Sequence, residues 1–206
     1  MKARVTRFKS LSLGLKELEQ FVRDGEHLQT GKPFKLFGEL RSRELLANWL
    51  LCVVANSWYK MERFTFTSDP SGGDGLLHDN VTGKSLPTEH ILVPRVSGLR
   101  PSSIEAAILR AIEKKQSKGG AAYASGKTLV VFLNSGGGEW FPNKVARQLP
   151  VPLHFVDAWV VGLQRVEDSG EYVYGVSLLD LGPGNAPSWL VSIAPDFSRW
   201  QVETVQ

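Results

Sequence analysis

The sequence predicts an α/β fold in which a mixed central sheet is flanked by helices, and three observations support this. An apolar, helix-forming stretch occupies 39–59, alternating segments that suit strands follow, and a second helix leads into the continuous apolar segment 128–134 (T-L-V-V-F-L-N). A continuous apolar strand is typical of a sheet covered on both faces. The order α-β-β-β-α-β-α-β, with more strands after it, therefore favours helices on both sides of a mixed sheet.

Each element has its own local signal. The helix at 39–59 is apolar on nearly every side from Leu45 onward, which indicates burial. Ser102 and Ser103 are suitable caps for a second helix, which is expected to end at Gly119-Gly120. Strands are expected at 63–67, 74–79, 86–93, 128–134, 153–165, 171–181 and 188–194, and a short helix at about 142–148.

Residues 1–37 are predicted to form an N-terminal helical extension, and residues 38–206 a single α/β domain. Apolar residues with helical spacing in the extension are Leu11, Leu15, Leu18, Phe21 and Val22. Gly31-Lys32-Pro33 suits a linker after that helix. A chain of 206 residues fits one domain with an appendage.

Composition excludes several classes of protein. Apolar residues make up 42% and charged residues 22% of the chain, and the net charge of +3 permits a polyanionic partner without requiring one. Cys52 is the single cysteine, so neither a disulfide framework nor a thiolate zinc site is expected. The basic N-terminal residues are not followed by the apolar stretch of a signal peptide, and the apolar run 45–58 is too short to span a bilayer. We therefore expect a cytoplasmic protein with no membrane partner.

The segment 68–95 predicts a β-hairpin that brings two carboxylates together, with residues 80–84 (N-V-T-G-K) as its turn. If the turn is centred on its second and third residues, positions whose numbers sum to about 163 face each other, so Asp74 lies opposite Glu89. Carboxylates held about 5 Å apart repel each other unless a proton or a cation lies between them. The pair indicates a divalent-metal site. The alternative is a turn-forming Asp74 and a solvent-facing Glu89.

Lys115 is a lysine on the apolar side of the second helix. The apolar stripe of that helix consists of Ile104, Ala107, Ile108, Ala111 and Ile112. At 100° per residue, Lys115 lies almost in line with Ile104. Its ammonium could reach the Asp74–Glu89 pair. The alternative is a lysine that extends to solvent and complements the C-terminal end of the helix dipole.

Glu44 is a candidate acidic residue on the first long helix. It shares one side of the helix with Asn48, four residues later. A buried glutamate needs a partner, whereas an exposed one at the start of a helix does not. Glu39 is a rival for the same role, because it falls in line with the apolar stripe.

A helix bearing a glutamate, a hairpin with Asp74 and then Glu89, and a following helix and apolar strand resemble the core of the PD-(D/E)xK (restriction-endonuclease-like) nuclease superfamily over residues 39–134. The resemblance implies an α-β-β-β-α-β core with additional C-terminal strands. It implies that Asp74 and Glu89 bind Mg²⁺ or Mn²⁺, with Glu44 as an outer or second-metal ligand. The small residues around Asp74, in Gly72-Gly73-Asp74-Gly75, also fit that family.

The chain departs from the family pattern at Ile91, which stands where the family has a lysine two residues after the glutamate. Some members supply this lysine from the following helix, and that possibility assigns the role to Lys115. His90 points away from Glu89 in a regular strand, so its main-chain carbonyl and not its imidazole is expected beside a metal.

The resemblance implies a prokaryotic-type, metal-dependent nuclease that hydrolyses phosphodiester bonds in DNA more than in RNA, with Asp74, Glu89 and Lys115 as its catalytic residues. Basic residues that border the site would contact nucleic acid: Arg95, Arg110, Lys114 and Lys118. A homodimer or a place in a larger complex is compatible with such an activity. The alternative on the same fold is a catalytically inactive module that binds nucleic acid or a protein partner.

Two glycine-containing motifs suggest other functions. Ser125-Gly126-Lys127-Thr128 imitates the end of a P-loop, but it precedes a strand, whereas a P-loop follows one. The turn 136–138 follows a strand and could cradle a phosphate in an unrelated α/β enzyme, although a flexible turn is favoured. The tryptophans expected in the core are Trp49, Trp58, Trp159 and Trp189, and Trp140 is expected to be exposed.

Overall fold

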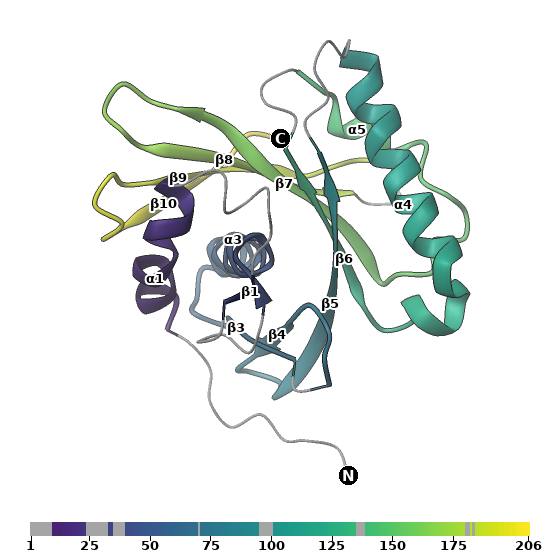
Figure 1. Ribbon diagram of the computed structural model, residues 1–206, viewed down its shortest axis with the longest axis horizontal. Coiled ribbons are helices and arrows are strands. Elements are labelled where there is room, and N and C mark those ends of the chain that lie inside the picture. Colours follow the sequence, from purple (N-terminus) through teal and green to yellow (C-terminus); the bar gives the residue numbers. More distant parts are fainter. Residues whose placement is uncertain are drawn as a thin grey trace.

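A mixed eight-stranded sheet forms the centre of the computed structural model, with strand order β10-β9-β8-β7-β6-β5-β4-β3 (Figure 1). The structure describes residues 10–23, 33–34, 40–69, 71–94, 101–134, 139–179, 182 and 184–206. The strands of this sheet are β3 (Phe64–Thr67), β4 (Leu76–Asp79), β5 (Lys84–Val93), β6 (Thr128–Leu133), β7 (Asp157–Val166), β8 (Tyr172–Leu179), β9 (Ser188–Ile193) and β10 (Trp200–Thr204). The helices are α1 (Leu11–Arg23), α3 (Ser42–Tyr59), α4 (Pro101–Ala124) and α5 (Pro142–Ala146), and the short strands β1 (Pro33–Phe34) and β2 (Leu40–Arg41) form a separate pair.

The sheet is mixed because its three central strands, β5, β6 and β7, are parallel neighbours, whereas the flanking pairs are antiparallel. α4 provides the crossover from β5 to β6, and α5 lies in the crossover from β6 to β7. Both helices lie on one side of the sheet, and α3 lies on the other (Figure 1). The predicted α/β class with a mixed sheet flanked by helices is therefore confirmed.

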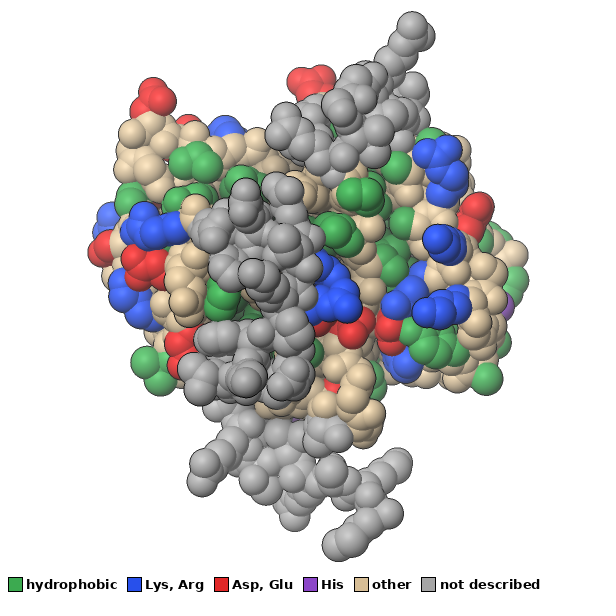
Figure 2. All heavy atoms as spheres, in the orientation of Figure 1, with side chains coloured by type: hydrophobic (Ala, Val, Ile, Leu, Met, Phe, Trp, Pro, Cys, Tyr) green, Lys and Arg blue, Asp and Glu red, His purple; other side chains and the backbone are tan. Residues whose placement is uncertain are grey.

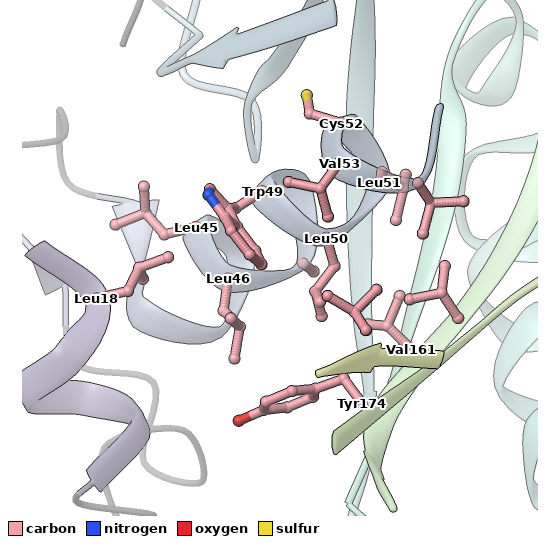
Figure 3. Packing of buried hydrophobic residues seen from close by; sticks show 14 of the residues in the cluster. Leu18, Leu45, Leu46, Trp49, Leu50, Leu51, Cys52, Val53, Val161 and Tyr174 are labelled. Atoms are coloured by element: carbon pink, nitrogen blue, oxygen red, sulfur yellow. The ribbon is translucent and has the colours of Figure 1, made fainter. Parts of the chain in front are cut away.

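α3 is buried on almost all sides because the sheet curls around it (Figure 1). Every residue from Ser42 to Val54 is buried, and Trp49 and Leu50 are fully enclosed. Leu18 of α1 approaches this helix from one side, and Val161 and Tyr174 of the sheet from the other (Figure 3). A helix in this position needs apolar residues all round, which is the pattern the sequence shows.

The opposite face of the sheet carries a second apolar cluster under α4 and α5. Ile104, Ile108 and Ile112 of α4 pack in the same cluster as Leu129 and Val131 of β6. Because successive side chains of a strand point to opposite faces, Val130 and Phe132 belong instead to the cluster around α3. Glu89, whose register partner is Leu129, thus lies on the α4 side of β5, and His90 lies on the α3 side.

Several elements differ from the sequence prediction. α4 was expected to end at Gly119-Gly120, but helix continues to Ala124 beyond a non-helical Gly120 (φ 61°, ψ −162°). The prediction omitted β10, a strand with mostly exposed side chains and thus little apolar signal. Trp58 was expected in the core, but it is 54% exposed and contacts Trp189 with a ring-centroid distance of 5.3 Å.

Two features bear on the environment of the chain. Cys52 is a buried, free thiol on α3, and burial raises its pKa well above the usual range. Among the described residues, no helix combines the length and the apolar character that crossing a membrane requires.

Candidate functional site

The predicted hairpin register is present in the structure. β4 and β5 pair from Leu76 with Pro87 to Asp79 with Lys84, so paired residue numbers sum to the predicted 163. One step beyond β4, the Thr88 amide donates to the Gly75 carbonyl at 2.9 Å. Asp74 directly precedes Gly75, and its Oδ2 accepts a hydrogen bond of 2.7 Å from the His90 amide. The Asp74 carboxylate therefore lies beside the Glu89–His90 segment of the neighbouring strand.

Asn48 of α3 fixes the approach of this part of the hairpin. Its Nδ2 donates to the Asp74 carbonyl at 3.2 Å, and its Oδ1 contacts His90 Nε2 at 3.1 Å. Gly75 permits this contact, because a Cβ there would lie 2.3 Å from Asn48 Nδ2. Its φ of 134° also disfavours other residue types. Asn48, fully buried, thus holds both strands of the site against the helix.

Glu89 forms ion pairs with two lysines. Lys115 Nζ lies 2.6 Å from Glu89 Oε1, and Lys127 Nζ lies 3.3 Å from Glu89 Oε2. Lys115 Nζ also donates to the His90 carbonyl at 3.2 Å. The structure therefore brings Lys115 to Glu89, one member of the carboxylate pair that its position on the apolar side of α4 predicted it to reach.

Tyr123 completes the surroundings of Glu89. Its ring centroid is 4.0 Å from Lys127 Nζ and 5.9 Å from Lys115 Nζ, distances at which an ammonium is attracted to the ring face. Tyr123 lies beyond the break at Gly120, in the last turn of α4. Burial raises its pKa above the usual range, and its hydrogen bond to Glu89 adds to this effect.

The two carboxyl groups of the hairpin have opposite electrostatic environments. Burial raises the pKa of Asp74 above its ordinary value; the His90 amide opposes this, and the charge of Glu89 adds to it. Burial also acts to raise the pKa of Glu89, but hydrogen bonds from Lys115 and Tyr123 and the charges of the lysines outweigh it, so the pKa is lowered. Glu89 is thus stabilised as an anion, whereas the ionised form of Asp74 is disfavoured.

Glu44 is buried at the start of α3 and is only 5% exposed, so the simple alternative of an exposed glutamate is wrong. Its Oε2 accepts a hydrogen bond of 2.8 Å from the Arg41 amide, which satisfies a main-chain donor at the helix start. Burial raises its pKa, and the charge of nearby Asp74 contributes. Arg43, also buried, lies 3.9 Å from Glu44 Oε1 through its Nη2 atom. Glu39 lies outside the described residues.

The His90 side chain faces away from the carboxylates, as the strand alternation predicted. Its Nε2 contacts Asn48 Oδ1 at 3.1 Å and Thr88 Oγ1 at 3.3 Å on the α3 side of the sheet. Burial, with a smaller effect of the Arg43 charge, lowers its pKa to about 3, so the imidazole is neutral. Only the main-chain carbonyl of His90 is turned toward Lys115.

The oxygen atoms at this site suit a hard divalent cation. Among the described residues, no group of three or more His, Cys, Asp or Glu side chains is gathered closely enough to hold a metal by itself. Mg²⁺ is usually bound by one or two carboxylates and keeps several waters. Asp74, Glu89 and the His90 carbonyl provide such a partial set, and the Lys115 ammonium, bonded to two of these oxygens, shows that the position favours a cation.

Basic residues line the outer side of α4 next to the site. Arg110, Lys114 and Lys118 are exposed and lie four residues apart, so they form one stripe along the helix. In Figure 2, basic side chains gather on the side of the molecule where α4 lies, with acidic side chains beside them. Arg95, the fourth predicted nucleic-acid contact, lies outside the described residues, as does the turn 135–138.

Sequence reasoning did not identify Lys127, Tyr123 or Arg43 as part of this site. Lys127 was considered only within the P-loop imitation, yet it directly precedes β6, which runs parallel to β5 with Glu89 opposite Leu129. No local sequence signal sets that register, so the contact of Lys127 with Glu89 could not be predicted. Tyr123 could not be located, because the predicted helix ended before it.

Comparisons with known proteins assign no role to this site. No protein-family model and no curated protein matches this chain. A solved structure, the central domain of yeast acetyl-CoA carboxylase, is similar with a TM-score of 0.36 and 11% identity, over 70% of this chain and 24% of that one. This chain thus spans about a quarter of that structure, and the likeness is too low to bear on fold or function.

Proposed function

We propose that this protein is a Mg²⁺- or Mn²⁺-dependent nuclease that hydrolyses phosphodiester bonds, in DNA more than in RNA. The observation that carries the proposal is that Asp74 bonds to the His90 amide, next to Glu89, while Lys115 pairs with Glu89 itself. The elements from α3 to β6 have the order α-β-β-β-α-β, which is the order of the restriction-endonuclease-like core that the sequence resembles. A cytoplasmic location and a partner subunit or larger complex belong to the same proposal.

Each residue would have a role in catalysis that its chemistry determines. Asp74, Glu89 and the His90 carbonyl would hold the metal, which when bound lowers the pKa of a coordinated water and neutralises charge on the phosphate. Asp74 must be ionised for this, and the burial that raises its pKa makes the metal-free anion less favourable despite the bond from the His90 amide. Lys115 supplies a compact positive charge next to the carboxylates, where it can stabilise negative charge that develops on the phosphate.

Binding of the polyanion would rest on the stripe of Arg110, Lys114 and Lys118. Exposed lysines and arginines contact phosphates without reading sequence. The stripe lies on α4, the helix that also carries Lys115. This arrangement supports a substrate recognised mainly through its backbone.

Cleavage of plasmid and single-stranded DNA with and without Mg²⁺ or Mn²⁺ tests the proposal. We expect metal-dependent cleavage that Asp74→Ala and Glu89→Ala abolish without unfolding the protein. Lys115→Met should slow cleavage by about 10²–10³-fold, the usual effect of removing one group that stabilises the transition state.

Two substitutions outside the site serve as matched controls. Asp168→Asn removes an exposed carboxylate from a turn, and Lys84→Met removes an exposed lysine from the start of β5. Both should cleave at the wild-type rate. Full activity in Asp74→Ala, or cleavage that persists in a chelator, would contradict the assignment.

One observation favours a second function, a catalytically inactive module that binds nucleic acid or a protein. Both oxygens of Glu89 already contact an ammonium, so its charge is compensated without a metal. Such a module would bind DNA equally well in a chelator and in Mg²⁺, and it would cut neither substrate. A gel-shift assay run beside the cleavage assay separates the two functions.

A further inference from the structure

Lys127 contacts Glu89 in a different way from Lys115. Lys115 Nζ bonds to both Glu89 Oε1 and the His90 carbonyl, so it is close to the oxygens proposed to hold a metal. Lys127 Nζ meets the other carboxylate oxygen, Oε2, and the face of Tyr123. Each lysine therefore occupies its own side of one carboxylate.

The position of Lys127 is fixed by its main chain and by Tyr123. Its amide donates to the Ala124 carbonyl at 3.1 Å, and its carbonyl accepts from the Val156 amide at 2.9 Å. The Tyr123 ring lies 4.0 Å from the ammonium, and Gly119 leaves room for the ring, because a Cβ there would lie 2.4 Å from Tyr123 Cβ. With its side chain 28% exposed, Lys127 is held at the site and remains in contact with water.

We propose that Lys127 takes the place of a second divalent ion on Glu89, so that the site binds a single metal ion. The inference rests on the proposed function. Two-metal sites place their ions about 3.5–4 Å apart and share carboxylates between them. Lys127 already holds one oxygen of Glu89, and its positive charge repels a further cation there.

The proposal gives Glu44 no metal to bind. Its Oε2 is engaged by the Arg41 amide, and Arg41 and Arg43 lie on the side of Oε1. Glu44 was a candidate second-metal ligand on the resemblance alone. Under this proposal, Glu44 secures the start of α3, and Lys127 supplies the positive charge that a second metal ion would otherwise provide.

Binding of Mn²⁺ to the full chain in the absence of nucleic acid tests the proposal, with free Mn²⁺ counted by electron paramagnetic resonance. We expect one Mn²⁺ per chain for the wild type. Lys127→Met, which keeps a long side chain but removes the charge, should bind two. Lys127→Gln gives an independent variant with the same expectation, and thermal unfolding confirms that each variant is folded.

The outcomes distinguish this inference from the proposed function. A wild type that binds one Mn²⁺, with Lys127→Met and Lys127→Gln also binding one, overturns the role of Lys127 and leaves the nuclease proposal standing. Two Mn²⁺ ions per wild-type chain would likewise overturn the role of Lys127. A wild type that binds none contradicts the metal-dependent nuclease itself. Lys84→Met should behave as the wild type, because this lysine lies at the hairpin turn.

Discussion

Among single residues, Asp74 and Glu89 show how neighbouring carboxyl groups acquire different properties. Glu89 has two ammonium groups in contact, whereas Asp74 is stabilised mainly by the His90 amide. Their pKa values therefore move in opposite directions from the ordinary range. Neighbouring carboxyl groups whose pKa values are shifted by their surroundings are found at catalytic sites. Of the two, Asp74 gains more from an added cation, because Glu89 already has two lysines in contact.

Asp74→Asn tests this difference through stability. Because the folded-state pKa of Asp74 is raised, the stability it contributes is present below the ordinary pKa and is lost as the pH rises through the raised value. The uncharged asparagine should raise the melting temperature at pH 7 by about 2–4 °C, which corresponds to about 1 kcal/mol, and the gain should shrink toward pH 4. Calorimetric scans of the variant and the wild type at both pH values measure this difference in melting temperature.

The same variant should lose stabilisation by metal. A wild type in Mg²⁺ at a hundred times its dissociation constant gains about 2.7 kcal/mol, and Asp74→Asn should gain far less. Asp168→Asn, on an exposed turn, is the control and should follow the wild type in both tests. A lower melting temperature for Asp74→Asn at pH 7 would be inconsistent with a destabilised Asp74 anion.

At the scale of elements, the hairpin depends on α3 for its position. Asn48 bonds to the Asp74 carbonyl and to His90, so one helix side chain joins both strands. Farther along α3, Asn56 bonds to the main chain of Phe64, at the start of the edge strand β3. The helix thus aligns the hairpin at one end and the sheet edge at the other.

Two glycines of this hairpin allow a matched test of that dependence. Gly83, in the turn, has a φ of 68° and open space around it, so Gly83→Ala should cost only the backbone strain, about 1–2 kcal/mol. Gly75→Ala adds displacement of Asn48, and we expect it to cost at least about 1–2 kcal/mol more, from the loss of two hydrogen bonds. Urea denaturation gives both values. Equal costs would show that the Asn48 contact does not position the hairpin.

The parts of the fold that the sequence predicted are those set by local rules. The turn at 80–84 determines the register of β4 and β5, and this register brings Asp74 beside Glu89. Helical periodicity likewise places Lys115 toward the sheet. Contacts across separate elements are different, because the pairing of β5 with β6 depends on how α4 packs. Lys127 reaches Glu89 only through that pairing, and Tyr123 only because helix continues beyond Gly120.

Across the whole molecule, the proposed nucleic-acid surface depends on charge arrangement more than on net charge. The formal charge is only +3, but the exposed stripe of Arg110, Lys114 and Lys118 concentrates positive charge along α4. Such a surface binds by releasing counterions from the nucleic acid. Affinity should therefore fall steeply as salt concentration rises.

The triple variant Arg110→Gln, Lys114→Gln and Lys118→Gln tests this surface. If each residue contacts one phosphate, the slope of log K against log salt for duplex DNA should become shallower by about 2–3 units. Fluorescence anisotropy between about 50 and 200 mM salt covers the useful range. Lys84→Gln should leave the slope unchanged. An unaltered slope in the triple variant would place the DNA on another surface.

The burial of Cys52 inside α3 has a practical consequence. This chain contains one cysteine, and its thiol is only 1% exposed, with a pKa raised by burial. Maleimide and nitroxide reagents react with exposed thiolates, so the native side chain is protected from them. A cysteine introduced at Val81, on the exposed hairpin tip, would then carry the sole label without any replacement in the core. The mobility of that label, read from its spectrum, would report on the hairpin as metal or DNA is added.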